Sequence, residues 1–178
     1  TMADRFRDKL KHLYVETMIQ YLTLDKSYAE RGNFEGAKWI LSPPLREKSD
    51  QAALWRALAD GRIDTLGTDH CPFDFNGQKT LGRGDFTKIP NGLAGVEERV
   101  ALAYTAGVVG GKISLERFVE VAAENPAKIF GLWGRKGTVA PGFDADLVVW
   151  DPHARRTISQ KTQSLDVDYN PYEGFEVV

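Results

Sequence analysis

The stretch Gly67-Thr68-Asp69-His70-Cys71-Pro72-Phe73 decides the fold, because it places a carboxylate and an imidazole where a buried strand gives way to a turn. The residues that lead into it, Ile63-Asp64-Thr65-Leu66-Gly67, have the β-branched and apolar character of a short strand. Asp69 therefore falls at or just beyond the C-terminal end of that strand. In a parallel α/β barrel, this end of each strand faces the active site.

Helices and short strands alternate on both sides of this strand. The spacing of apolar residues predicts another strand over 13–17 and a helix over 47–59. The stretch 73–91 is rich in glycine and charge and has weak periodicity, which indicates a long loop of the kind that often has a function. The other expected helices cover 3–13, 97–109, 115–123 and 125–130, the last with Pro126 in its first turn. This order of elements is typical of the last part of a barrel.

The composition changes after about Trp133. Short strands punctuated by glycine are expected over 145–150 and 155–159, with turns at Pro141-Gly142 and Asp151-Pro152. We therefore expect a domain boundary here, with residues 1–133 in one unit and 134–178 in a second, β-rich unit.

The overall composition limits the setting in which the protein works. A net charge of −2, 42% hydrophobic and 27% charged residues describe an ordinary globular chain without a basic stripe for nucleic acid. The sequence has no apolar run long enough for a membrane span, so no membrane partner is expected. Its single cysteine, Cys71, excludes an intrachain disulfide and favours a reducing, cytoplasmic compartment. We interpret Cys71 itself as a small buried residue.

Motifs spread over the chain from about Val15 onward point to one family. Ser42-Pro43-Pro44-Leu45-Arg46 precedes the strand and its turn, and Lys88-Ile89-Pro90-Asn91-Gly92 follows them. The other segments that fit are Gly77-Gln78-Lys79, Asp85-Phe86-Thr87, Gly95-Val96-Glu97-Glu98-Arg99, Asn125-Pro126-Ala127-Lys128, Lys136-Gly137-Thr138-Val139, Ala145-Asp146-Leu147-Val148 and Asp168-Tyr169-Asn170-Pro171. Together they resemble the dihydropyrimidinase and hydantoinase family of cyclic amide hydrolases, within the wider amidohydrolase superfamily.

This resemblance implies an α/β fold, the C-terminal part of a (β/α)₈ TIM-like barrel followed by short strands of a small β-sandwich. The whole enzyme would open dihydropyrimidines or 5-substituted hydantoins to N-carbamoyl amino acids. It would use two zinc ions or other divalent metals and would commonly form a homo-oligomer, a tetramer. A complete barrel needs about 250 residues, and this chain has 178. We therefore expect a C-terminal fragment that binds no catalytic metal and has no hydrolase activity by itself.

Asp69 is the candidate catalytic residue. The resemblance implies that it is both a metal ligand and the group that carries a proton between the attacking water and the leaving nitrogen. A carboxylate suits both tasks, because a nearby dication keeps it ionised while it can still accept a proton transiently. The residue taken alone favours an Asx turn that caps the loop, and the surrounding motif favours the catalytic role.

Ser42 and Asn91 are the candidate substrate-binding residues. By resemblance, their backbone groups hydrogen-bond the cyclic imide of the substrate. The local sequence suits this role, because Pro43-Pro44 stiffens one loop and Asn91-Gly92 permits backbone angles that let the main chain approach a ligand. From the residues alone, both positions could equally be simple turn residues.

The histidines do not complete a metal site. His70 follows Asp69 directly, and neighbouring side chains on an extended strand point to opposite faces, so we interpret His70 as structural. His12 and His153 fit surface positions. The family's His-x-His pair, carboxylated lysine and two further histidines cannot be identified in this chain, and the resemblance places them before it.

Two other classes of function stay open at this level. One is a non-catalytic relative of dihydropyrimidinase that acts through assembly or interaction, although such proteins typically lack the aspartate and have an altered Pro-Asn-Gly motif. The other is a different amidohydrolase such as allantoinase, which fits the segment 88–92 less well. A structural fragment that pairs with a second chain is a further possibility. The sequence does not decide between dihydropyrimidine and hydantoin rings.

Overall fold

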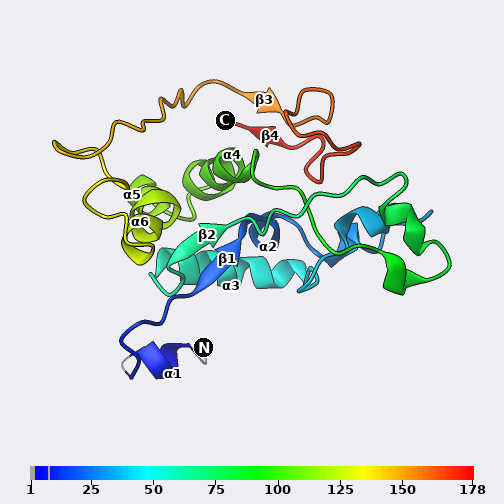
Figure 1. Ribbon diagram of the computed structural model, residues 1–178, viewed down its shortest axis with the longest axis horizontal. Coiled ribbons are helices and arrows are strands. Elements are labelled where there is room, and N and C mark those ends of the chain that lie inside the picture. Colours follow the sequence, from blue (N-terminus) through cyan, green and yellow to red (C-terminus); the bar gives the residue numbers. More distant parts are fainter. Residues whose placement is uncertain (1–2, 8) are drawn as a thin grey trace.

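The computed structural model describes residues 3–7 and 9–178 of the chain (Figure 1). Two short parallel strands lie at the centre of its larger part, with helices packed around them, and the C-terminal segment runs across the top of the helices in Figure 1. In the described ranges, none of the helices combines the length and the apolar character that crossing a bilayer requires.

The central strands are β1 (Glu16–Met18) and β2 (Thr65–Gly67), which pair in parallel with Thr17 opposite Leu66. The pairing extends before β2, since the backbone N–H of Asp64 donates to the carbonyl of Val15 at 2.7 Å. Parallel neighbours need a crossover connection, and the helix α3 (Lys48–Ala59) lies between them in the chain. The strand expected over 13–17 is therefore present but shifted toward its C-terminal side, and the strand expected over 63–67 is confirmed.

One hydrophobic core joins the strands to the helices. Trp55 and Leu58 of α3 are buried in it, and the indole N–H of Trp55 donates to the carbonyl of Leu22 at 3.1 Å. The C-terminal residues Ile158 and Tyr172 are fully buried in the same core. Other members come from each part of the fold: Ile19, Leu24, Trp39, Leu41, Leu66, Leu93, Leu102, Phe118, Val121 and Val177. The helix expected over 47–59 is thus present as α3, and its apolar residues Trp55 and Leu58 are buried.

The helices after the long loop are more continuous than the sequence indicates. The helix α4 (Arg99–Ala103) continues as the π-helical turn η5 (Tyr104–Val109). Then α5 (Leu115–Val119), the π-helical η6 (Glu120–Glu124) and α6 (Asn125–Ile129) follow without a break. The helix expected over 125–130 is therefore present as α6, with Pro126 in its first turn, although it continues from η6 instead of following a break. Pro126 fits inside the continuous helix because the π-helical turn before it changes the local hydrogen-bonding pattern.

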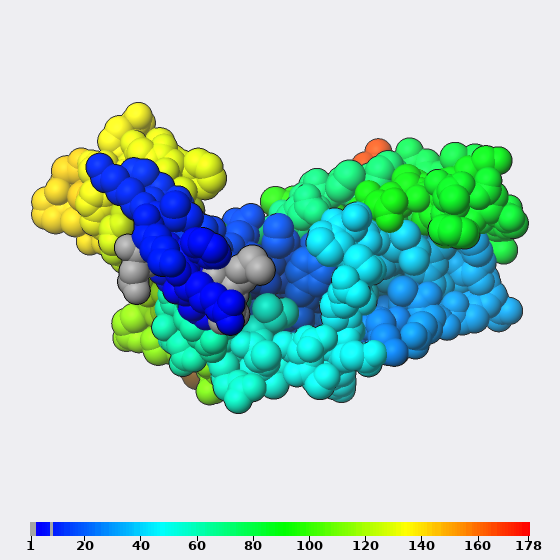
Figure 2. All heavy atoms as spheres, turned by 90° about the horizontal axis from the view of Figure 1, so that it is seen from below, coloured from blue at the N-terminus to red at the C-terminus, as the bar shows by residue number. Residues whose placement is uncertain are grey.

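The N-terminal helix is much shorter than expected. Instead of 3–13, α1 covers Asp4–Arg7, and residues 9–13 contain no helix. Phe6 and Leu10, which the spacing assigned to a buried face, are 44% and 50% exposed. A short amphipathic helix is stabilised mainly by packing of its apolar face. This segment lies on the outside of the molecule, below the strands in Figure 1 and at the front of Figure 2.

The stretch 73–91 is a loop with two single 3₁₀ turns, η3 (Lys79–Gly82) and η4 (Phe86–Lys88). It packs through Phe75 and Ile89 against Ala37 and Tyr169 in a small second cluster. Three further short helices belong to the first part of the chain: α2 (Ile19–Thr23), η1 (Lys26–Tyr28) and η2 (Glu35–Trp39).

The C-terminal segment contains fewer strands than expected. Residues 145–150 are irregular, so the strand expected there is wrong, and Val149 is 98% exposed. Alternation and β-branching indicate a strand only where another strand pairs with it, and no described segment does so here. The strand expected over 155–159 is present as β3 (Arg156–Thr157), antiparallel to β4 (Glu176–Val177). The division of the chain at residue 133 stays a prediction.

Candidate active site

Asp69 lies just beyond the C-terminal end of β2, as the sequence indicates. Its backbone is in the left-handed region, with φ of 49°, and its side chain is exposed. Aspartate tolerates this conformation better than most residues, because its short polar side chain can bond locally. Gln20 of α2 stabilises the turn. Its side chain is buried, and its amide donates to the carbonyl of Thr68 at 2.9 Å.

His70 has a structural role, as expected. Its Nδ1 accepts hydrogen bonds from the backbone N–H groups of Gly95 (3.1 Å) and Val96 (3.2 Å). The next residue, Cys71, donates its N–H to the carbonyl of Leu93 at 3.0 Å. Hydrogen bonds thus join the two residues after Asp69 to the segment 93–96. Cys71 is exposed rather than buried, which corrects the sequence interpretation, because the described part of the chain places no layer over this edge.

Asn91 is brought against the Asp69 segment by the glycine that follows it. A Cβ added to Gly92 would lie 2.3 Å from the carbonyl oxygen of Cys71, so only glycine permits this approach, and its φ is +156°. The N–H of Gly92 donates to the carbonyl of Ile40 at 3.0 Å. Within the described residues, neither backbone polar group of Asn91 has a hydrogen-bond partner, so both are free to meet a ligand.

Lys79 fills the space between these loops. Its side chain is completely buried, and its ammonium donates to three carbonyl oxygens, those of Ile40 (2.9 Å), Pro90 (2.7 Å) and Gly92 (2.9 Å). The ring centroid of Phe73 lies 5.6 Å from the nitrogen. Burial lowers the pKa of Lys79 to about 8, and the neighbouring Cys71 opposes this shift.

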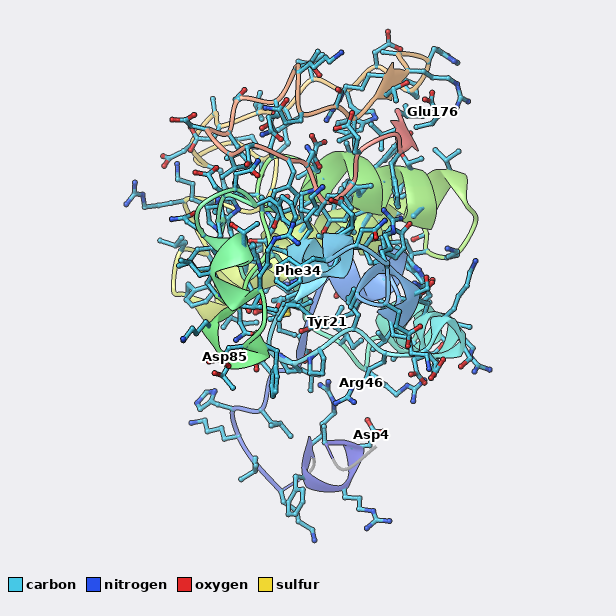
Figure 3. The ribbon with its side chains drawn as sticks, turned by 90° about the vertical axis from the view of Figure 1, so that its right-hand side faces the viewer. Asp4, Tyr21, Phe34, Arg46, Asp85 and Glu176 are labelled. Atoms are coloured by element: carbon cyan, nitrogen blue, oxygen red, sulfur yellow. The ribbon has the colours of Figure 1, made fainter. Side chains whose placement is uncertain are left out.

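Ser42 is exposed on a loop that Tyr21 anchors. The phenol of Tyr21 donates to the carbonyl of Pro43 at 2.7 Å. Burial raises the pKa of Tyr21, the carboxylate of Asp69 raises it further, and Arg46 lowers it. The charge of Asp69 therefore acts on the phenol of Tyr21, whose hydroxyl is bonded to the Ser42 loop. Figure 3 labels Tyr21 and Arg46 on the side of the molecule from which the N-terminal helix projects.

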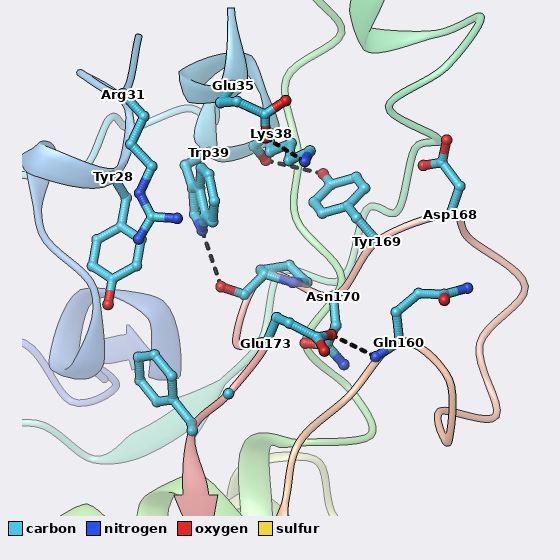
Figure 4. A pocket seen from close by; sticks show the side chains of 13 residues that line it. Tyr28, Arg31, Glu35, Lys38, Trp39, Gln160, Asp168, Tyr169, Asn170 and Glu173 are labelled. Atoms are coloured by element: carbon cyan, nitrogen blue, oxygen red, sulfur yellow. Dashed lines mark hydrogen bonds and ion pairs between the residues drawn. The ribbon is translucent and has the colours of Figure 1, made fainter. Parts of the chain in front are cut away.

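The structure also contains two sizeable cavities. One of about 700 Å³ borders Tyr21, Pro43 and Arg46 and continues along α3 to Arg62. Another of about 520 Å³ opens between η2 and the C-terminal segment (Figure 4). There the Arg31 guanidinium lies over the ring of Trp39, 4.3 Å from its centroid, and the Trp39 indole donates to the carbonyl of Pro171. Asp69, Ser42 and Asn91 line neither cavity; they lie on an open edge.

The described residues do not by themselves fit a two-metal centre. Nowhere in 3–7 and 9–178 do three His, Cys, Asp or Glu side chains gather around one point. His12 contacts Tyr14 on an exposed segment, and the backbone of His153 bonds Asp151 in an exposed turn. A divalent ion at a protein site needs several such ligands, and Asp69 is a single donor.

The comparison with known proteins identifies the family. A model of the amidohydrolase family matches residues 12–175. The chain belongs to the amidohydrolase family. Members of the hydantoinase branch generally use divalent metals. Enzymes of this kind hydrolyse the C–N bonds of cyclic amides.

The relatives belong to the hydantoinase branch, which confirms the resemblance drawn from the motifs. The D-hydantoinase of Geobacillus stearothermophilus is 54% identical over 171 residues, which are 96% of this chain and 36% of that enzyme. The D-hydantoinase of Streptomyces coelicolor is 52% identical over 170 residues, again 36% of the enzyme. The chain therefore spans about a third of the length of the curated relatives that it matches.

Solved structures agree with the sequence relatives. The D-hydantoinase from a Bacillus sp. AR9 superposes with a TM-score of 0.95 at 53% identity, covering 98% of this chain and 38% of that one. The dihydropyrimidinase from Brevibacillus agri NCHU1002 gives a TM-score of 0.95 at 51% identity with the same coverage. The fold of this chain is thus that of the matching part of the solved hydantoinases, which have the TIM-barrel amidohydrolase fold.

Two residues of the site were not found from the sequence. Lys79 was noticed only within a motif, since a lysine in a charged, glycine-rich loop is normally exposed. Tyr21 falls in a short helix that the apolar pattern did not indicate. For Lys79, the signal available was the nearby aromatic residue Phe73, whose ring lies beside its ammonium in the fold.

Proposed function

We propose that the whole protein opens cyclic amides by hydrolysis, and that this chain supplies Asp69 and the substrate-binding backbone of Ser42 and Asn91. The substrates would be dihydropyrimidines or 5-substituted hydantoins, and the products N-carbamoyl amino acids. The observation that carries this proposal is the position of Asp69 at the end of β2, beside the Asn91-Gly92 turn, in a chain 54% identical to a D-hydantoinase.

The chemistry requires a proton carrier and donors beside a developing oxyanion. Asp69 is exposed at the turn, and within residues 3–7 and 9–178 its carboxylate accepts no hydrogen bond. Its carboxylate oxygen can therefore take the proton of the attacking water and return it to the leaving nitrogen. The unpartnered N–H of Asn91 can donate to a ring carbonyl, and carbonyl groups of the two loops can accept from the ring N–H. These backbone contacts orient the ring without adding a charge.

We also propose that two zinc ions, or other divalent metals, act in the whole enzyme, with Asp69 as one ligand. When bound, such metals lower the pKa of a water molecule so that it attacks at neutral pH. The remaining ligands would come from residues outside this chain, because the described residues contain no group of three His, Cys, Asp or Glu side chains that could hold a metal ion. The chain alone is then expected to bind no catalytic metal and to have no hydrolase activity.

The same proposal extends to the architecture. Residues 1–133 would form the last part of the (β/α)₈ barrel, with β1 and β2 as two adjacent barrel strands, and 134–178 would begin the β-sandwich. The parallel pairing of β1 and β2 around the crossover helix α3 supports this reading. A cytoplasmic homo-oligomer, a tetramer as in the family, is proposed for the whole enzyme on the resemblance alone.

A hybrid enzyme tests the proposal. In it, this chain replaces the matching segment of the Geobacillus stearothermophilus D-hydantoinase, and hydrolysis of hydantoin and dihydrouracil is measured together with zinc content. The hybrid is expected to be active, and Asp69→Asn is expected to reduce turnover by about 10²-fold or more. Asparagine tolerates the left-handed backbone at this position, so the substitution removes the charge and leaves the turn intact.

The matched control is Asp60→Asn, which changes an exposed carboxylate at the end of α3. It is expected to leave turnover unchanged. A hybrid that folds and binds zinc but opens neither ring would refute the proposed function, and so would an Asp69→Asn hybrid with the turnover of the unmodified hybrid. A folded hybrid without activity would favour the assembly class of relatives instead.

A further inference from the structure

Lys79 is a buried cation in the loop 73–91, whose other charged residues are exposed or partly exposed. No part of its side chain is exposed, and each of the three N–H bonds of an ammonium finds a carbonyl oxygen within 2.9 Å. Burying a charge is costly unless it is hydrogen-bonded throughout. The three hydrogen bonds offset that cost. They also fix the direction in which the three carbonyl groups point, which is toward the ammonium of Lys79.

The three carbonyl groups belong to the two loops assigned to the substrate. Ile40 lies two residues before Ser42, whereas Pro90 and Gly92 lie on either side of Asn91. The carbonyl of Ile40 also accepts from the N–H of Gly92, so the loops are joined directly as well as through the ammonium. Lys79 thus sets the spacing between the Ser42 loop and the Asn91 loop.

The direction of the Asn91 backbone follows from these contacts. The Pro90–Asn91 and Asn91–Gly92 peptide bonds are trans, and in a planar trans peptide the C=O and the N–H point in opposite directions. The carbonyl of Pro90 points at Lys79, so the N–H of Asn91 points away from it. The N–H of Gly92 points at Ile40, so the carbonyl of Asn91 points away from that loop.

We propose that Lys79 is a positioning residue, which holds the N–H and the carbonyl of Asn91 outward for the cyclic amide and fixes the distance to the Ser42 loop. This inference rests on the proposed function and deepens it. Lys79 does not touch the substrate, because its ammonium is enclosed by protein carbonyl groups and the ring of Phe73. It acts through the main chain of the residues that do.

The ammonium form is the one present at neutral pH. Burial lowers the pKa of Lys79 to about 8, Cys71 acts in the opposite direction, and the other groups that face the nitrogen are the three carbonyls and the uncharged ring of Phe73. All three donors are therefore available when the enzyme works near pH 7. A neutral side chain of the same length would leave at least one carbonyl buried without a donor.

The test uses the hybrid enzyme with Lys79→Met, which keeps the length and apolar stem of the side chain and removes its donors. We expect KM for hydantoin to rise about tenfold or more, in line with the loss of hydrogen bonds from a charged donor. A smaller fall in kcat and an unchanged zinc content are expected, since Asp69 is on another segment. Lys79→Gln, which retains two shorter-reaching donors, should give an intermediate KM.

The matched control is Lys88→Met, the same change on the same loop, where the ammonium is exposed beside Asp85. It is expected to leave KM and kcat unchanged. A folded Lys79→Met hybrid with the KM of the unmodified hybrid would overturn the inference. So would a loss of zinc that parallels the loss of activity, because Lys79 would then support the whole site rather than the substrate loops.

A second measurement separates this inference from the proposed function. Should the unmodified hybrid be inactive, hydrogen exchange of the Gly92 amide in the 178-residue chain still reports on the two loops. Faster exchange in Lys79→Met than in Lys88→Met would support the positioning role, and equal exchange would overturn it.

Discussion

Asp69 combines an unusual backbone conformation with an exposed charge. A non-glycine residue in the left-handed region costs of order 1–3 kcal/mol and persists only where its surroundings hold it. Here the surroundings are the Gln20 bond to Thr68 on one side and the His70 bonds to Gly95 and Val96 on the other. Among the residues that the structure describes, none donates a hydrogen bond to this carboxylate, which is the arrangement that the proposed proton carrier needs.

The titration of Tyr21 provides a direct test of where the Asp69 charge lies. Burial raises the pKa of Tyr21 first, and Asp69 raises it further, so Asp69→Asn should lower it. Arg46 acts in the opposite direction, and Arg46→Gln should raise it. NMR of ¹³Cζ-labelled tyrosine in the 178-residue chain measures both shifts. Because the pKa of Tyr21 is raised in the folded chain, its contribution to stability is fully present below the unfolded pKa of about 10. This contribution is lost as the pH rises through the folded pKa. The two substitutions should therefore not change stability at neutral pH through Tyr21.

Tyr28 is the internal reference for that experiment. Its pKa is also raised mainly by burial, but its charged neighbours are Arg31 and Asp25 rather than Asp69. It should titrate identically in all three proteins. A Tyr21 resonance that moves no more than that of Tyr28 in Asp69→Asn would contradict the described position of Asp69.

At the scale of elements, contacts with distant segments of the chain hold the loop 73–91 in place. Besides Lys79, the carboxylate of Asp168 in the C-terminal segment accepts from the backbone N–H groups of Phe75 (2.6 Å) and Asn76 (2.9 Å). Partial burial acts to raise the pKa of Asp168, but the donors of Asn76 and Phe75 outweigh it and lower the pKa. A stretch without periodicity is thus held by contacts across more than 90 residues of sequence.

The stability of this loop should depend on pH through Asp168. Because its folded pKa lies below the unfolded value of about 3.9, its contribution is present above that value and is lost as the pH falls through the folded pKa. Asp168→Asn should lower the free energy of unfolding at pH 7 by about 1 kcal/mol. Denaturant unfolding at pH 7 and near pH 2 measures this, and the difference from the unmodified chain should shrink at the lower pH.

Asp166→Asn is the control for that measurement, since Asp166 is exposed two residues away and its carboxylate bonds no loop N–H. It should have little effect at either pH. Equal losses in Asp166→Asn and Asp168→Asn would mean that net charge, rather than the bonds to Phe75 and Asn76, sets the result.

At the scale of the whole molecule, the C-terminal segment leaves apolar side chains in solvent. Leu147, Val148 and Val149 are 59%, 79% and 98% exposed, and Val139 is 82% exposed. Monomeric proteins rarely leave such runs uncovered, and an unpaired extended segment is a site for association.

The 178-residue chain is therefore expected to self-associate as its concentration rises. Replacing Val148 and Val149 by lysine should weaken this association roughly tenfold or more, because an unpaired charge is costly to bury at an apolar contact. Sedimentation velocity over a range of concentrations measures it. Val109→Lys, which changes a half-exposed valine at the end of η5, is the control. Unchanged association of the double variant would show that the contact lies elsewhere.

The sequence by itself determined the strand 63–67, the helix 47–59, the position of Asp69 at the strand end and the family. These features depend on local apolar periodicity and on motifs, which are readable within a few residues. It failed at 3–13 and 145–150, where the outcome depends on whether another segment is there to pack or pair.

Only the tertiary structure decided how the site is held. Gly92 packs closely against Cys71, and the phenol of Tyr21 donates to the carbonyl of Pro43. The ammonium of Lys79 donates to carbonyl groups of two loops that are about fifty residues apart in the sequence. Such contacts leave no periodic pattern, because a single buried lysine has the same local sequence as an exposed one. Its burial is settled by the full set of acceptors that the folded chain brings around it.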